Sequence, residues 1–262
     1  ETGWYLKDLK SGNSSDRNGS VVLPSASVRK IAIMMTGMQA ITAGKISLQQ
    51  RVPIEEIYQN NDSGCFQHFQ PDFDISFRDA MLMMIIVSDN TCTGAVANLL
   101  GLDAINEFSQ SIGMIGTTHR FGIPPGGMTG QYSAAETNST TPSDVGLLLE
   151  IILAGTRDKH TAKQLGTTPE LCQLAIDILT WQRLKNRIPL LLPSGTKVAH
   201  KTGTSGRNHN DAGIIYFGDQ PGFIFSAFTD EVPSKLDDGI PGAFGASHLI
   251  GRMARHCFDV LA

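Results

Sequence analysis

The chain has 262 residues, of which 41% are hydrophobic and 18% charged, so it can bury the core of one compact unit or of two closely packed lobes. Its formal net charge of −4 comes without a long basic run, which argues against nucleic acid or an anionic membrane surface as a partner. No apolar stretch reaches the ~20 residues of a transmembrane helix. The sequence therefore predicts no integral membrane segment.

Taken in chain order, the apolar periodicities predict a hairpin, a run of helices, three strands and a last helix. These are a hairpin over 4–9 and 21–23, helices over 27–43, 77–87, 93–100 and 104–112, a loop over 113–139, helices over 143–154 and 169–184, strands over 197–201, 213–217 and 223–228, and a helix over 246–261. Ser76 and Asp79 resemble a capping box before the second helix. Strands at both ends with helices between them favour an α+β fold, in which one antiparallel sheet joins the termini beside a helical lobe.

Three short motifs occur in one order along the chain. They are Ser27-Val28-Arg29-Lys30, Ser88-Asp89-Asn90 and Lys201-Thr202-Gly203. Together they form the signature of class A β-lactamases and penicillin-binding proteins. With Thr140-Thr141-Pro142 and Asn210-Asp211-Ala212-Gly213 added, the chain resembles the class A serine β-lactamase family over nearly its whole length.

This resemblance implies a fold and a division of the chain. The fold would be a single β-lactamase-like domain, with an antiparallel five-stranded sheet flanked by helices (an α/β sandwich) and an all-helical lobe. The α/β lobe would take in residues from about 1–26 and 195–262, and the helical lobe those from about 27–194.

Ser27 and Lys30 are the candidate nucleophile and base. Positions three apart lie on one face of a helix, so the two side chains point the same way. A serine hydroxyl needs a base within hydrogen-bond reach, and a lysine buried beside other cations can lose its proton. By the resemblance, Ser88 passes the proton to the leaving nitrogen, and the backbone N–H groups of Ser27 and Thr204 form the oxyanion hole.

The remaining motif residues are expected to bind substrate. By the resemblance, Asn90 holds the substrate amide and steadies Lys30, Lys201 adds positive potential and Thr202 offers a hydroxyl to a carboxylate. Gly203 would let a ligand approach the strand edge closely. Arg207 is a further candidate, since arginine binds carboxylates in bidentate fashion, but an exposed loop arginine is the favoured alternative.

One loop departs from the family pattern. Class A members carry a glutamate before the Thr-Thr-Pro helix that positions the hydrolytic water, and this chain lacks the Glu-x-x-Leu-Asn sequence there. Between His119 and Pro142 the one carboxylate is Glu136. It is either the base that activates water or an exposed loop residue. If Glu136 does not reach Ser27, the acyl-enzyme should be released slowly.

The leading interpretation is a serine acyl hydrolase that opens β-lactam rings through a Ser27 acyl-enzyme. A D-Ala-D-Ala peptidase or esterase and a non-hydrolytic penicillin-binding sensor stay open, because one fold hosts several activities. The partner would be a small β-lactam or an acyl-D-Ala-type substrate. A monomer without metal or cofactor is expected, in the periplasm or secreted, although no signal peptide is present.

The four cysteines leave two possibilities. They are Cys65, Cys92, Cys172 and Cys257. Either all four are partly buried free thiols, or Cys65 and Cys92 form a bridge, since both would flank the site in the family fold.

Overall fold

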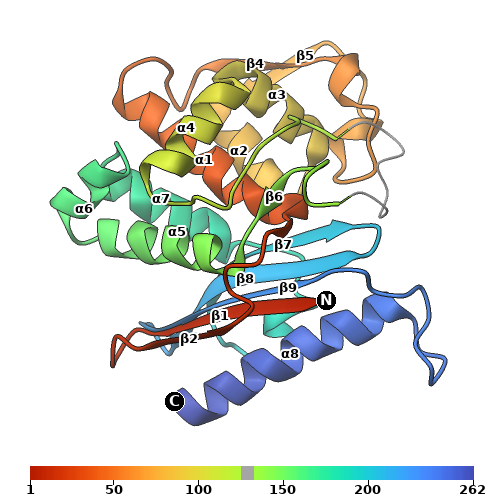
Figure 1. Ribbon diagram of the computed structural model, residues 1–262. Coiled ribbons are helices and arrows are strands. Elements are labelled where there is room, and N and C mark those ends of the chain that lie inside the picture. Colours follow the sequence, from red (N-terminus) through yellow and green to blue (C-terminus); the bar gives the residue numbers. More distant parts are fainter. Residues whose placement is uncertain (125–132) are drawn as a thin grey trace.

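The computed structural model describes residues 1–124 and 133–262. Its centre is an antiparallel sheet with the strand order β2-β1-β9-β8-β7 (Figure 1). The strands are β1 (Thr2–Asp8), β2 (Ser14–Arg17), β7 (Val198–Ser205), β8 (Asn208–Phe217) and β9 (Gln220–Thr229). The two ends of the sequence therefore meet in one sheet, as predicted, and β7 lies at its edge.

Helices cover both faces of this sheet (Figure 1). Successive residues of a strand point to opposite faces, so Phe223 and Phe225 pack with Ile250 of α8 (Gly242–Leu261). Ile224 and Phe228 enter the larger core on the other face. There α5 (Pro142–Gly155) and α7 (Pro169–Thr180) contact the strands.

The helical part is built around one buried helix. In α1 (Lys30–Thr42) every residue from Lys30 to Met38 is buried, so it lies in the middle of the helices rather than at their surface. The elements around it are α2 (Phe77–Ile86), α3 (Asn90–Leu100), α4 (Leu102–Ser111) and α6 (Lys159–Gln164), the short strand pairs β3 (Leu23–Pro24) with β6 (Ser139–Thr140) and β4 (Arg51–Ile54) with β5 (Phe73–Ser76), and the 3₁₀ turns η1 (Ala26–Arg29), η2 (Glu56–Tyr58), η3 (Phe66–His68) and η4 (Ile188–Leu191).

The predicted N-terminal hairpin is wrong in its second strand. The partner of β1 is β2, whose four side chains are all exposed, and not residues 21–23. Such an edge strand is held by backbone hydrogen bonds and carries no apolar alternation that a sequence pattern could reveal. Leu23 instead pairs with Thr140.

Several helix starts also differ from the prediction, among them that of the last helix, which begins at Gly242 and not at residue 246. Ser27 lies in the 3₁₀ turn η1 and not in the first turn of the α-helix that follows. The helix expected from residue 93 begins at Asn90, because the Asp89 side chain caps it by accepting from the Cys92 N–H. The capping role of Ser76, which accepts from the Asp79 N–H, is confirmed.

All four cysteines are free thiols, so the structure contains no Cys65–Cys92 bridge. Cys92 and Cys172 are buried, and Cys65 and Cys257 are partly exposed. In the two described ranges, no helix combines the length and the apolar character that crossing a bilayer requires.

Candidate functional site

The three motifs meet where a helix start, a turn and a strand edge come together. Ser27 lies in η1, Ser88 in the turn between α2 and α3, and Lys201 in β7. Strand β7 packs directly against η1. Segments far apart in the sequence thus bring their polar side chains to one place.

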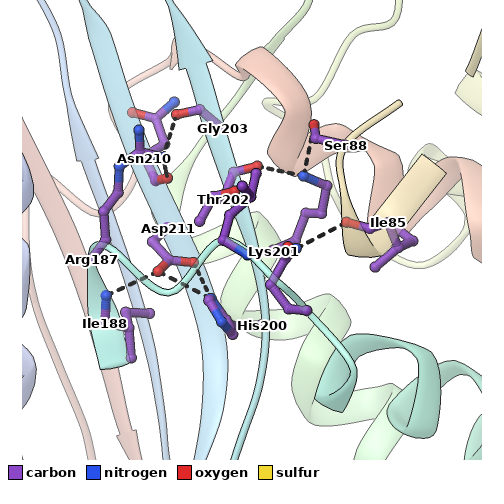
Figure 2. Close-up of polar contacts among 12 residues, drawn as sticks. Ile85, Ser88, Arg187, Ile188, His200, Lys201, Thr202, Gly203, Asn210 and Asp211 are labelled. Carbon is purple, nitrogen blue, oxygen red and sulfur yellow. Dashed lines mark hydrogen bonds and ion pairs between the residues drawn. The ribbon is translucent and has the colours of Figure 1, made fainter. Parts of the chain in front are cut away.

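The Ser88 hydroxyl lies between two lysine amines. Lys30 Nζ donates to Ser88 Oγ at 3.2 Å, to the Ser88 carbonyl at 2.7 Å and to Asn90 Oδ1 at 2.7 Å. From the other side Lys201 Nζ donates to Ser88 Oγ at 3.0 Å and to the Thr202 carbonyl at 2.7 Å (Figure 2). A proton can therefore pass between either amine and this hydroxyl over one hydrogen bond.

Ser27 is half-buried in η1, which contacts β7, the strand of Lys201, and α1, the helix of Lys30. Among the described residues, the two amines donate to Ser88, Asn90 and the Thr202 carbonyl, and neither donates to the Ser27 hydroxyl. The sharing of a face by Ser27 and Lys30 was inferred from α-helical geometry, whereas Ser27 is in a 3₁₀ turn. The hydroxyl that both amines contact directly is therefore that of Ser88.

The pKa of both amines lies below the usual value of a lysine. Burial, Lys201 and Arg29 hold the pKa of Lys30 well below its usual value, against the opposing charges of Asp89 and Cys92. Burial lowers the pKa of Lys201 to about 7, and Asp211 opposes this while Arg187 adds to it. A buried lysine with a lowered pKa can act as a base, and its protonated form as an acid.

The turn that carries Ser88 is strained and held by Asp89. Ser88 has a φ of 58°, which costs free energy for a residue other than glycine. The fully buried Asp89 carboxylate accepts the N–H groups of Cys65 at 2.8 Å, Phe66 at 2.9 Å and Cys92 at 2.9 Å. The sequence-based expectation that Asp89 binds backbone rather than substrate agrees with these contacts.

Gly64 leaves room for the Asp89 carboxylate that holds these backbone N–H groups. It has a φ of 93°, and a Cβ there would overlap an Asp89 carboxylate oxygen. Only glycine fits this position.

Gly203 brings the strand edge close to the nucleophile turn. A Cβ on Gly203 would lie 3.0 Å from Val28 Cγ2 and 3.1 Å from both Ala26 Cβ and the Ser25 carbonyl. A larger residue would push β7 away from η1. Of the two residues that flank Gly203, Thr202 is buried, whereas Thr204 is exposed and accessible to a ligand.

Sequence reasoning missed Arg187. Its guanidinium is buried, and Nη1 donates to the carbonyls of Gly203 at 3.0 Å and Asn210 at 2.8 Å (Figure 2). Nη2 donates to Thr204 Oγ1 at 2.5 Å. No local pattern marks this residue, because it reaches the strand from a loop after α7. It is better placed than Arg207 to meet a carboxylate beside Thr204.

A buried carboxylate fixes the loop of Arg187. Asp211 accepts from the Ile188 N–H at 3.0 Å and contacts His200 Nδ1 through both oxygens, at 2.9 and 3.1 Å (Figure 2). Because Asp211 faces Thr202 in the β7–β8 register, it ties the loop to the strand that carries Lys201.

Arg207 and Glu136 are not brought to the lysine network. Arg207 is exposed in the β7–β8 turn, and its Nη2 donates to the Glu231 carbonyl at 2.9 Å. Glu136 is exposed, and its carboxylate accepts the N–H and the hydroxyl of Ser133, at 3.0 and 2.8 Å. These contacts lower the pKa of Glu136, with the Ser133 hydroxyl as the main cause.

A metal centre has no obvious place in the described ranges. There, no group of three or more His, Cys, Asp and Glu side chains is arranged to hold a metal ion.

Comparison with known proteins finds relatives of the sequence and structures with a similar fold. One curated relative is a β-lactamase of Bacteroides uniformis, which is 27% identical over 93% of this chain and 81% of the relative. Another is the extended-spectrum β-lactamase PER-1 of Pseudomonas aeruginosa, which is 26% identical over 79% of this chain and 68% of the relative. Two solved structures with the same fold are PBP-A, with a TM-score of 0.84, 24% identity and coverage of 99% and 89%, and a β-lactamase from Sphaerobacter thermophilus, with a TM-score of 0.85, 23% identity and coverage of 99% and 91%.

The family model described as "Beta-lactamase enzyme family" matches residues 1–261, nearly the whole chain. The match agrees with the family resemblance inferred from the three motifs. The chain belongs to the β-lactamase enzyme family.

Proposed function

We propose that this protein is a serine hydrolase that opens β-lactam rings through an acyl-enzyme on Ser27. The observation that carries the proposal is the Ser88 hydroxyl held between the buried amines of Lys30 and Lys201, beside the turn of Ser27. This arrangement supplies a nucleophile, a base and a route for its proton.

The reaction would combine ring opening with a series of proton transfers through Ser88. The neutral Lys30 amine takes up the Ser27 hydroxyl proton through Ser88, and Ser27 Oγ bonds to the lactam carbonyl carbon. The carbon–nitrogen bond then breaks, and Ser88 delivers a proton to the nitrogen, while Lys201 replenishes the Ser88 hydroxyl. The N–H groups of Ser27 and Thr204 would stabilise the oxyanion, which the close approach of β7 to η1 at Gly203 supports.

Substrate binding would use the edge strand and the cations beside it. Asn90 would hold the amide side chain, while Lys201, Thr202 and Thr204 would face the carboxylate together with Arg187. We expect the two lobes to act as one domain in a monomer that works in the periplasm or outside the cell. Small β-lactams or acyl-D-Ala-type molecules are the expected partners.

Incubation with a penicillin should add the mass of the drug to the peptide that contains Ser27. Intact-protein and peptide mass spectrometry measures this directly. The Ser27→Ala variant serves as the control and should remain unmodified. An adduct on another residue, or one that forms equally in the variant, would contradict the proposed nucleophile.

The acyl-enzyme should accumulate because deacylation lacks a well-placed carboxylate among the described residues. The Asp89 and Asp211 carboxylates already accept hydrogen bonds from backbone N–H groups, and the Glu136 carboxylate accepts from Ser133. Stopped-flow absorbance with a chromogenic cephalosporin should therefore show a burst followed by slow turnover.

In the same assay Glu136→Gln should leave the adduct lifetime unchanged within about twofold, because a general base must lie within hydrogen-bond reach of its water. A much longer lifetime in this variant would restore Glu136 as the base. A permanently stable adduct in the unaltered protein would instead indicate a penicillin-binding protein.

A further inference from the structure

Arg29 is a buried positive charge without a counter-charge. Its side chain is 5% exposed, Nη2 donates to the Gly122 carbonyl, and Nη1 has no partner among the described residues. No described carboxylate forms an ion pair with it, and residues 125–132 contain neither Asp nor Glu in their sequence. An unpaired buried charge costs much free energy, so its position calls for a functional reason.

Arg29 lies in η1, the 3₁₀ turn that also contains Ser27. It lies between Ser27 and Lys30 in the sequence and is the last residue of η1. The charged or titratable groups that act electrostatically on Lys30 are Arg29 itself, Lys201 from β7, Asp89 from the α2–α3 turn and the Cys92 thiol from α3. The Asp89 carboxylate is already bound to three backbone N–H groups.

An arginine can do in this place what a lysine cannot. A buried lysine becomes neutral by losing its proton, whereas a guanidinium keeps its charge. Burial lowers the pKa of Arg29 only to about 10, so it stays positive at neutral pH. A residue with a permanent charge thus directly precedes a lysine whose charge can change.

We propose that Arg29 is a positioning residue of the acylation step, whose fixed positive charge keeps the Lys30 amine in its neutral, proton-accepting form. The inference rests on the proposed role of Lys30 as the base. It assigns to Arg29 an electrostatic role, since its guanidinium is directed to Gly122 and takes part in none of the hydrogen bonds around Ser88. The competing explanation is mechanical, with Arg29 only tying the loop at Gly122 to η1.

Two substitutions separate the two explanations. Arg29→Gln removes the charge and keeps a side-chain donor for the Gly122 carbonyl, whereas Arg29→Met removes both. The measurement is the acylation rate by a penicillin across pH. In both variants the acidic limb of the profile should move to higher pH by about one unit, because the positive charge that disfavours protonation of Lys30 is gone. Below the limb, both should acylate about tenfold more slowly.

A matched control comes from an exposed arginine. Arg51→Gln removes a charge of the same kind that is paired with Asp74 at the surface, where solvent screens it, and its profile should overlay that of the unaltered protein. If the acidic limb of Arg29→Gln does not move and acylation is slower only in Arg29→Met, the electrostatic role is overturned and the mechanical role remains.

A second measurement does not depend on activity. The ¹³Cε resonance of Lys30, assigned by its absence in Lys30→Arg, should titrate at higher pH in Arg29→Gln than in the unaltered protein. An identical midpoint in the two proteins would overturn the proposal. If the unaltered protein forms no adduct at all, the proposed function fails, and this titration still decides the effect of Arg29 on Lys30.

Discussion

Replacing Lys30 with alanine is expected to slow the acylation of Ser27 by about 10²–10⁴-fold, the usual contribution of a positioned acid or base. The Lys30 amine donates to Ser88 Oγ and Asn90 Oδ1, and burial with two neighbouring cations favours its neutral form. Without it, Ser88 would keep one amine partner, Lys201. Quenched-flow mass spectrometry of the penicillin adduct gives the rate.

Lys45→Ala is the matched control, since Lys45 is an exposed lysine just after α1. It should acylate at the rate of the unaltered protein. Lys30→Ala should also lose the acidic limb of the pH profile, because the titrating base is gone. A rate within about tenfold of the unaltered protein, below the range given above, would mean that Lys201 and Ser88 suffice as the proton route.

Replacing Asp89 with alanine is expected to lower the free energy of unfolding by about 3–5 kcal/mol. The change would leave the buried N–H groups of Cys65, Phe66 and Cys92 without their acceptor and would remove the cap of α3. It would also release the strained turn at Ser88, so acylation should fall together with stability. Urea denaturation gives the free energy.

Asp158→Ala provides the comparison, because Asp158 also caps a helix. Its carboxylate is exposed and accepts the N–H groups of His160 and Thr161, which water can satisfy when the acceptor is lost. The loss of stability should therefore be clearly smaller than for Asp89→Ala. Equal losses in the two variants would show that Asp89 acts as a cap alone and not as a clamp on the loop before Phe66.

The parts of the fold that follow local rules could be predicted from the sequence. The three C-terminal strands were recognised in part, over 197–201, 213–217 and 223–228, and the Ser76 cap and Pro142 marked helix starts. The β2 strand was missed because its exposed polar residues pair through the backbone alone. The paired strands β4 and β5 were missed because each has four residues and the chain between them shows no period.

The site was predictable only where its residues lie in motifs. The order and spacing of the three motifs are enough to identify Ser27, Lys30, Ser88 and Lys201 as candidates. Arg187 could not be found in this way, since its relation to Thr204 exists only once the loop after α7 folds against β7. For Glu136, the sequence showed that a carboxylate was present, but its direction depends on its contact with Ser133.

The charges buried around the site affect how stable the protein is at different pH values. Arg29, Lys30, Arg187 and Lys201 are buried there with two carboxylates, Asp89 and Asp211. The pKa of both lysines is lower in the folded chain than the usual value of about 10.4 for an unfolded one. Between these values the unfolded chain binds more protons, so folding becomes more favourable as pH rises from about 7, the folded pKa of Lys201, towards about 10. At neutral pH the two buried amines therefore lower the stability of the fold. Replacing Lys201 with an apolar residue of similar length would give a more stable but inactive protein.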